Sequence, residues 1–209
     1  MSRALRRVAT IGLCLGLLAG CGGPGNELDS TSSLESPRLR APGPETVPDY
    51  VLERIPYSDA AQPVEIAIPS VEIEGSIQPV GMTDAVTMQV PRDIGVVGWF
   101  DRSVVPISDI GNTVLVGHRD GADDPNGVFR RLSDVQQGDA ITVRDLTGRA
   151  VEYAVESVEL LGRSDFAGNA EEVFDTSGAH HLVLLTCGGE YERSQGGYQA
   201  NVVVYATRT

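Results

Sequence analysis

Short strand patterns run from residue 63 to the end of the chain, and they limit its fold more than any other feature. Apolar residues alternate over 64–68 and again over 71–74, and apolar or β-branched runs cover 113–116, 181–187 and 201–207. Two longer alternating segments, 140–146 and 150–161, are joined by Thr147-Gly148, which is a hairpin signal. Many short strands of this kind predict a mostly β domain, either a barrel or a sandwich.

Helical spacing is rare in the same region. Apolar residues at 128, 129, 132 and 135 predict one helix over 128–136, and a second short helix is expected near 168–174. Gly75 and Pro79 interrupt the pattern after residue 74, so that strand is expected to end there. No repeat or internal domain boundary is visible, so residues 63–209 are predicted to form one domain.

Residues 1–21 have the organisation of a secretory signal. Three arginines among the first seven residues precede an uncharged, largely apolar run of 13 residues, 8–20. That run is too short to span a bilayer comfortably and has the length of a signal-peptide core. Residues 18–21 read Leu-Ala-Gly-Cys, which resembles the bacterial lipoprotein box and implies diacylglycerol on the sulfur of Cys21. The alternative is an ordinary secretory signal in which Cys21 is incidental.

Residues 22–62 differ in composition from the rest. Gly, Pro, Ser, Glu and Asp dominate and hydrophobic periodicity is absent, which predicts a flexible tether between a lipid anchor and the domain. The chain has a formal net charge of -13, and all 16 of its basic residues are arginine. Without a basic stripe to neutralise phosphates, nucleic acid is excluded as a partner.

Cysteine usage points to residue 187. Cys14 would leave with the signal peptide and Cys21 would carry lipid, so Cys187 would be the single thiol of the mature protein. A lone thiol is unusual in an extracytoplasmic protein. It follows the apolar run 182–185 and precedes Gly188 and Gly189, where the strand is expected to stop, so the thiol would stand at a junction of strand and loop. The alternative is a buried cysteine that acts as a small hydrophobe.

His118 stands at the end of the apolar strand 113–116, as Cys187 does at the end of its own strand. An imidazole near a thiol can lower its pKa or move its proton, so the two residues are a candidate catalytic pair. His180 and His181 lie at the far end of the second strand and are expected to be structural. The histidines and the thiol lack paired metal-ligand spacing, and no metal site is predicted.

Several segments resemble the sortase family. Thr186-Cys187 after Leu184-Leu185 resembles the Thr-Leu-x-Thr-Cys signature of sortases, and residues 116–118 resemble their catalytic-histidine segment. Residues 127–139 resemble the short helix and turn that follow that histidine. Residues 187–189 together with 197–206 resemble the ending of class F sortases of actinobacteria. The resemblance covers residues 63–209.

The resemblance implies a closed eight-stranded β-barrel and a cysteine transpeptidase. The substrates would be secreted proteins with a C-terminal sorting signal of the Leu-Pro-x-Thr-Gly type, cut between Thr and Gly. Cys187 would attack the Thr carbonyl to form a thioacyl enzyme, and His118 would act as general acid and base. A cell-wall precursor amine, or water, would release the product on the outer face of the membrane. No metal or organic cofactor is implied.

The sequence departs from the family at the third catalytic position. Many sortases carry an arginine on the final strand, near the position that Asn201 occupies here. Arg193 is the one arginine between Cys187 and Asn201, and it is expected to supply the donor to the oxyanion or substrate. Asn201 is the alternative donor. If Arg193 has no catalytic role, it is a solvated charge on a loop.

Other functions remain to be weighed. Cell-wall peptidases of the NlpC/P60 type place Cys before His, the reverse of this chain, and L,D-transpeptidases use a Ser-x-Gly-Cys segment that is absent here. A catalytically silent lipoprotein that binds sorting-signal peptides is the second hypothesis, because the expected arginine is missing from the final strand. A thioacyl adduct on Cys187 would separate the enzyme from the binder.

Overall fold

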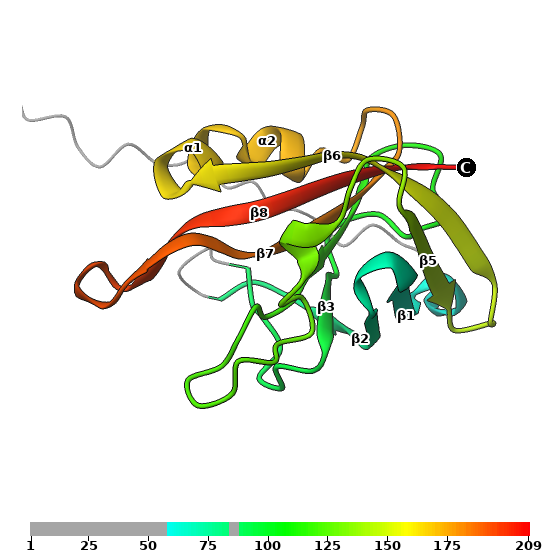
Figure 1. Ribbon diagram of the computed structural model, residues 1–209. Helices are drawn as coiled ribbons and strands as arrows, with labels where there is room; N and C mark the ends of the chain where they lie inside the picture. Colours follow the sequence, from blue (N-terminus) through cyan, green and yellow to red (C-terminus); the bar gives the residue numbers. More distant parts are fainter. Residues whose placement is uncertain (1–57, 84–87) are drawn as a thin grey trace, which may run out of the picture. The chain divides into compact units, whose positions relative to one another are not determined.

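The computed structural model describes residues 58–83 and 88–209, and eight strands in this part of the chain close into a barrel (Figure 1). The order around the barrel is β1-β2-β3-β4-β7-β8-β6-β5. Strands β2 and β3 are parallel, as are β4 and β7, and the other neighbours are antiparallel. The strands are β1 (Pro63–Ile68), β2 (Ile73–Val80), β3 (Val97–Phe100), β4 (Asn112–Val116), β5 (Ala140–Asp145), β6 (Ala150–Gly162), β7 (His181–Glu192) and β8 (Gly197–Arg208).

The helices are short. Helices α1 (Arg163–Gly168) and α2 (Ala170–Val173) follow β6, and Figure 1 shows them beside the barrel at the end of that strand. Four 3-10 turns complete the elements: η1 (Asp59–Ala61), η2 (Pro69–Val71), η3 (Leu132–Asp134) and η4 (Arg193–Gln195). The prediction of a closed eight-stranded barrel with one or two short helices is confirmed.

Alternation along the strands divides the apolar residues between two clusters. On β7, Leu182 and Leu184 face the barrel interior, where they pack with Leu115 and Tyr153. The intervening Val183 and Leu185 belong to a second cluster outside the barrel, which packs against Phe166 and Phe174 from the helices and the residue after them. The middle of β7 is therefore buried on both faces, which explains why its sequence reads as a continuous apolar run.

Three local predictions differ from the structure. Gly75 and Pro79 lie inside β2, which pairs with β1 through Ser76 and then with β3 from Ile77 onward. Pro79 thus sits where the pairing with β1 has ended, so its missing N–H costs no bond on that side. Strand β7 does not stop at residue 188 but continues to Glu192 through an irregularity.

The segment 128–136 forms turns and the 3-10 turn η3 rather than one helix. The N–H of Val128 donates to the carbonyl of Ile94, and the N–H of Phe129 donates to that of His118. Within the segment, the N–H groups of Arg130, Leu132 and Asp134 donate to carbonyls only three residues back, which gives turns rather than an α-helix. The apolar residues still serve the core, since Phe129 and Leu132 are fully buried.

Two other predictions are confirmed. The Thr147-Gly148 turn joins β5 to β6, with Gly148 at a positive φ of 83°. Helices α1 and α2 overlap the segment near 168–174. The end of the predicted tether, 58–62, forms η1, whose Ala61 is buried in the core. The lipoprotein box with Cys21 and the rest of the tether lie outside the described residues.

Candidate active site

Cys187 and His118 follow the ends of two neighbouring parallel strands. The register pairs Val116 of β4 with Leu185 of β7. The N–H of Gly117 then donates to the carbonyl of Leu185 over 3.0 Å. Cys187 comes two residues after Leu185, and His118 comes two residues after Val116. The two strands therefore carry both residues past the same edge of the sheet.

Strand periodicity also directs both side chains to one face. Residues two apart on a strand share a face, and Leu185 and Val116 both belong to the cluster outside the barrel. On β8, Asn201 pairs with Cys187 across the strands and stands two residues before Val203 of the same cluster. Cys187, His118 and Asn201 are accordingly brought together on the outer face, where all three line common hollows.

A buried side-chain bond joins the two strand ends. The hydroxyl of Thr186 donates to the carbonyl of Gly117 over 2.8 Å, and Thr186 is only 4% exposed. These are the residues immediately before Cys187 and His118. The Thr-Cys pair noted in the sequence thus has a structural reason: the threonine ties the thiol's strand to the histidine's.

A hydrogen bond to a backbone carbonyl orients the ring of His118. His118 Nε2 lies 2.7 Å from the carbonyl oxygen of Pro91, and because a carbonyl only accepts, Nε2 carries a proton. Nδ1 is then the ring nitrogen left to take up or release a proton. Gly127 lies against the histidine's backbone, and a Cβ built there would stand 2.3 Å from the carbonyl oxygen of His118. Any other residue at 127 would displace the histidine.

Two hollows meet at the thiol. The apolar groove, about 430 Å³ in volume, runs along the helices beside β4 and β7. Besides Cys187, His118 and Asn201, it is lined by Met88, Val90, Val116, Gly117, Phe166, Ala167, Ala170, Phe174, Leu185 and Thr186. These side chains are almost all apolar, so the groove suits an apolar peptide segment.

The polar hollow, about 840 Å³, lies over the β7–β8 hairpin and shares Cys187, His118 and Asn201 with the groove. Its other lining residues are Ile94, Asp120, Gly121, Ala122, Arg163, Tyr191, Arg193, Gly196, Gly197, Tyr198 and Ala200. It contains both charge signs and opens beside the thiol. The thiol therefore stands between an apolar and a charged hollow.

Cys187 is exposed to solvent and free. Partial burial of the sulfur raises its pKa, and the Asp120 carboxylate raises it further, while Arg163 and Arg119 act in the opposite direction. The net pKa lies above the ordinary value, so at neutral pH the thiol keeps its proton until a base removes it. This arrangement requires a proton acceptor nearby, a part that His118 can fill.

Polar and aromatic contacts connect the segment after His118 to the hairpin. The hydroxyl of Tyr198 on β8 donates to Asp120, and the Arg119 guanidinium lies 5.2 Å from the centre of the Tyr198 ring. Tyr191 on β7 packs edge-on against Tyr198, with ring centres 5.1 Å apart. The hydrogen bond to Asp120 also raises the pKa of Tyr198. These contacts fix the hairpin against the histidine segment.

Three residues could donate to the substrate beside the thiol. Asn201 is the cross-strand partner of Cys187, and Arg193 is exposed on η4 at the tip of the hairpin. Both were predicted from the sequence, and both line the polar hollow. Arg163, at the start of α1, lines it too and was missed. No sequence signal marks Arg163, because only the barrel register brings residue 163 near residue 187.

His180 lies outside both hollows and has a structural contact. The hydroxyl of Tyr153 donates to the carbonyl of Pro106, and the Nε2 of His180 lies 3.0 Å from the oxygen of that hydroxyl. Burial lowers the pKa of His180 to about 4, so the ring is neutral at neutral pH. His180 therefore serves the packing of the barrel end, as expected.

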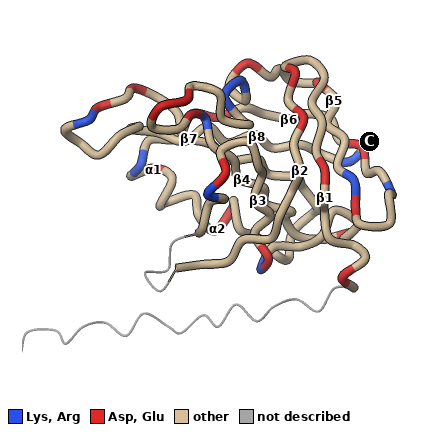
Figure 2. The backbone as a smooth tube through the Cα atoms, turned by 90° about the horizontal axis from the view of Figure 1, so that it is seen from below, with Lys and Arg blue, Asp and Glu red and all other residues tan. Residues whose placement is uncertain are grey.

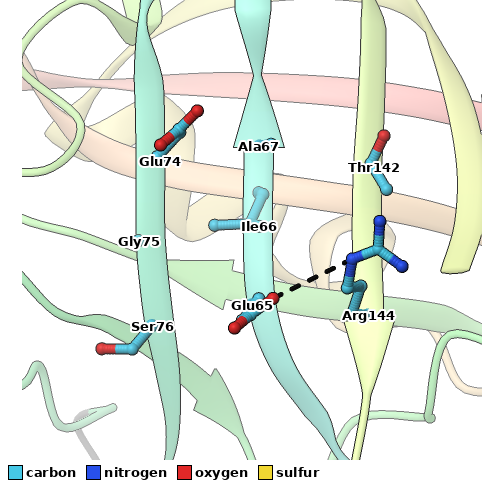
Figure 3. A pocket seen from close by; sticks show the side chains of 8 residues that line it. All are labelled: Glu65, Ile66, Ala67, Glu74, Gly75, Ser76, Thr142 and Arg144. Carbon is cyan, nitrogen blue, oxygen red and sulfur yellow. Dashed lines mark ion pairs between the residues drawn. The ribbon is translucent and has the colours of Figure 1, made fainter. Parts of the chain in front are cut away.

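A further hollow on the outer face of β1, β2 and β5 carries no comparable chemistry. Figure 3 shows its lining on the three strands, with Glu65 paired to Arg144 at 3.9 Å. No thiol or imidazole lines it. Over the described residues, Figure 2 shows acidic and arginine residues interspersed along strands and loops.

Residues 58–83 and 88–209 contain neither a metal-binding cluster nor a membrane-spanning helix. No group of three or more His, Cys, Asp or Glu side chains is arranged there to hold a metal ion. No helix in the same ranges has the length and apolarity needed to cross a bilayer.

Several solved sortase structures share this fold. The chain is similar to sortase A from Corynebacterium diphtheriae (lid mutant), with 20% identity, a TM-score of 0.53, and coverage of 70% of this chain and 69% of that one. It is also similar to sortase C-1 from Actinomyces oris, with 22% identity, a TM-score of 0.53, and coverage of 71% and 75%. Sortase C2 of Group B Streptococcus Pilus Island 1 gives 20% identity, a TM-score of 0.52, and coverage of 70% and 73%. At such identities the likeness establishes the fold alone.

The family assignment rests on the sequence rather than on the structural similarity. A comparison with curated protein sequences finds no match. Residues 66–209, well over half of the chain, match the family described as Sortase domain. The chain therefore belongs to the sortase family, whose members are cysteine transpeptidases.

Proposed function

We propose that this sortase cleaves a sorting signal of the Leu-Pro-x-Thr-Gly type between Thr and Gly and transfers the acyl part to an amine of a cell-wall precursor, or to water. The observation that carries the proposal is the position of Cys187 and His118 past the ends of paired parallel strands, between the two hollows. The apolar groove suits the Leu-Pro end of the signal. The polar hollow leaves room for the departing and incoming amines.

The first half of the reaction makes the acyl enzyme. The Cys187 proton passes to Nδ1 of His118, and the thiolate attacks the Thr carbonyl carbon. The carbonyl electron pair moves to oxygen and gives a tetrahedral oxyanion. When that intermediate collapses, the C–N bond breaks, and His118 returns the proton to the leaving Gly nitrogen. The product is a thioester between the Thr carbonyl and Cys187.

The second half reverses these roles. An amine in the polar hollow attacks the thioester carbonyl, and His118 accepts the proton that the amine loses. The C–S bond then breaks and Cys187 leaves as the thiol or thiolate. Water can replace the amine, in which case the reaction is a hydrolysis. We propose that Arg193 donates to the oxyanion or to the substrate carbonyl, with Asn201 as the alternative donor.

Class F membership and a lipid anchor complete the proposal. The motifs at 187–189 and 197–206 support class F, and the Leu-Ala-Gly-Cys sequence at 18–21 supports lipid on Cys21. The protein would then act on the outer face of the cell membrane on secreted proteins. Mass spectrometry of the membrane fraction tests the anchor: a diacylglyceryl group is expected on an N-terminal Cys21. A mature chain that retains Met1 or has an unmodified Cys21 excludes it.

The activity is tested on the full chain in mild detergent, with a panel of sorting peptides and amines. Leu-Pro-x-Thr-Gly peptides should be cut between Thr and Gly, and an added amine should appear on the Thr carbonyl. Cys187→Ala should remove turnover with little change in thermal unfolding, since the residue is small and exposed, and His118→Ala should also remove turnover. Substantial turnover in either variant would refute the assignment. A chain that binds the peptides without cutting them would favour the catalytically silent binder.

A further inference from the structure

Arg163 lines the polar hollow from α1, an element that the sequence patterns do not link to the active site. Strand β6 pairs with β8 on the side opposite β7, and the registers align Leu161 with Asn201 and Asn201 with Cys187. The next row joins Gly162, Ala200 and Gly188. Arg163 follows directly after this row, at the first position of α1.

The row beside Arg163 consists of small residues. Gly188 has no side chain and Ala200 has only a methyl group, and Ala200 forms part of the floor of the polar hollow. Strands β6 and β7 flank β8 and so lie roughly 10 Å apart, about twice the spacing of neighbouring strands. An extended arginine side chain covers most of that distance. Arg163 and Cys187 therefore flank the same strand and line the same hollow.

The guanidinium is held in place by the hairpin. Its Nη1 donates to the carbonyl of Gln195 over 3.0 Å, and its Nη2 donates to that of Gly196 over 3.1 Å. Both carbonyls belong to the turn at η4, which also carries Arg193. Gly196 adopts the left-handed conformation, with φ 82°, that closes this turn. Figure 1 shows α1 on the side from which the β7–β8 hairpin projects.

We propose that Arg163 is a positioning residue of the active site, which fixes the turn carrying Arg193 and holds positive charge beside Cys187. Two of the five N–H donors of its guanidinium are bound to carbonyls, so three remain for water or a substrate carbonyl. The proposal rests on the proposed function for the reaction itself. The positioning of charge at Cys187 is independent of the substrate.

Several charged groups face the thiol, and their effects on its ionisation must be distinguished from that of Arg163. Asp120 and Arg119 come from the segment after β4, His118 precedes them, and Arg163 comes from α1. Tyr191, Arg193 and Tyr198 line the polar hollow from the hairpin. Of the arginines, Arg163 and Arg119 favour the thiolate. Arg193 is therefore expected to act on the substrate rather than on the ionisation of Cys187.

The test measures alkylation of Cys187 against pH in the full chain, resolved on the Cys187 peptide by mass spectrometry, together with peptide turnover. Arg163→Gln keeps a donor for a hairpin carbonyl but loses the charge, whereas Arg163→Lys keeps the charge. Arg163→Ala and Arg163→Gln should move the alkylation midpoint upward by about half a pH unit or more, and Arg163→Lys should leave it near wild type. Arg163→Ala should also lower kcat/KM about 10- to 100-fold, because the turn carrying Arg193 is released.

Two matched variants complete the experiment. Arg193→Ala should lower kcat/KM and leave the alkylation midpoint unchanged, and Arg144→Ala, on β5 outside both hollows, should change neither. If Arg163→Gln has the wild-type midpoint, or restores turnover as well as Arg163→Lys does, the charge has no part and the proposal is overturned. If the wild-type chain turns over no sorting peptide, the proposed function fails, but the alkylation midpoints still decide the role of Arg163. Denaturation followed by Trp99 fluorescence confirms that each variant is folded.

Discussion

The hydroxyl of Thr186 donates to the carbonyl of Gly117 over 2.8 Å, and this bond joins the residues immediately before Cys187 and His118. Both partners are buried, so water cannot substitute for the hydroxyl easily. The distance between nucleophile and base therefore depends on a side chain other than those of the two reacting residues. Such a link is a target for a substitution that changes geometry without touching the chemistry.

Thr186→Val removes the donor but keeps the shape of the side chain. We expect a loss of about 1–3 kcal/mol in the free energy of unfolding, because a buried carbonyl loses its partner. We also expect kcat/KM to fall about 10- to 100-fold as His118 and Cys187 lose their alignment. Thr186→Ser restores the hydroxyl and should recover most of both. A valine variant with wild-type turnover would mean that the backbone bonds alone set the alignment.

The same residues show which parts of the fold and of the candidate site could be predicted from the sequence. The run 182–185, the Thr-Cys pair and the position of His118 after 113–116 were all visible as local patterns, and parallel pairing of β4 with β7 brings them together. Strand β3 was missed because it has only four residues, all buried, and so shows no alternation. The helix expected over 128–136 was wrong because the N–H groups of this segment bond three residues back, as in turns, rather than four.

Irregular strands and long-range neighbours explain the remaining differences. Gly188 and Gly189 do not end β7, since Gly189 adopts a positive φ of 73° within a strand that bulges and continues. Arg163 reaches the site only because β6 and β7 flank the same strand. A single sequence contains no local signal for such a register, so a residue of this kind becomes visible only in three dimensions.

The ionisation of Cys187 should respond to Asp120. The pKa of the thiol is raised, first by partial burial and then by the Asp120 carboxylate, so removing that negative charge must lower it. Asp120→Asn should therefore increase the thiolate fraction and the alkylation rate of Cys187 at pH 7, and should shift the rate profile to lower pH. The amide can still accept the bond from Tyr198. Asp123→Asn, in the exposed part of the same segment, is the matched control, and a slower rate in Asp120→Asn would contradict the account.

Arg193 and Asn201 can be compared directly as donors to the oxyanion. Loss of one such donor costs about 100- to 1000-fold in rate. We expect Arg193→Ala to lower kcat/KM far more than Asn201→Ala does, because a guanidinium offers several donors in a fixed fork. The measurement is steady-state cleavage of a quenched sorting peptide. Near wild-type cleavage by Arg193→Ala, with a crippled Asn201→Ala, would assign the role to the amide.

The β5–β6 turn should contribute to stability through Asp145. Its carboxylate accepts from the hydroxyl and N–H of Thr147 and from the N–H of Arg149. These bonds, the Thr147 hydroxyl first, lower the pKa of Asp145. Asp145→Ala should lower the free energy of unfolding by about 1–3 kcal/mol at pH 7, measured by denaturant titration with the fluorescence of the single tryptophan, Trp99.

The sign of the pH dependence follows from the lowered pKa of Asp145. The carboxylate's contribution is fully present above the unfolded-state pKa of about 3.9 and is lost as pH falls through the folded-state pKa. The difference between wild type and Asp145→Ala should therefore be constant near neutral pH and shrink below about pH 4. The exposed Asp123→Ala should show no such difference. A gap that stays constant into strong acid would mean that the turn does not depend on the charge.

The central claim is that Cys187 forms a thioester with the sorting signal, and intact-protein mass spectrometry after rapid acid quench measures it most directly. A Leu-Pro-x-Thr-Gly peptide with no added amine should increase the mass of the chain by that of the acyl fragment ending at Thr, with the modification on the Cys187 peptide. The adduct should disappear on addition of a nucleophilic amine and should be absent in Cys187→Ala. Release of the cleaved peptide with the adduct on no residue, or on another residue, would contradict the account.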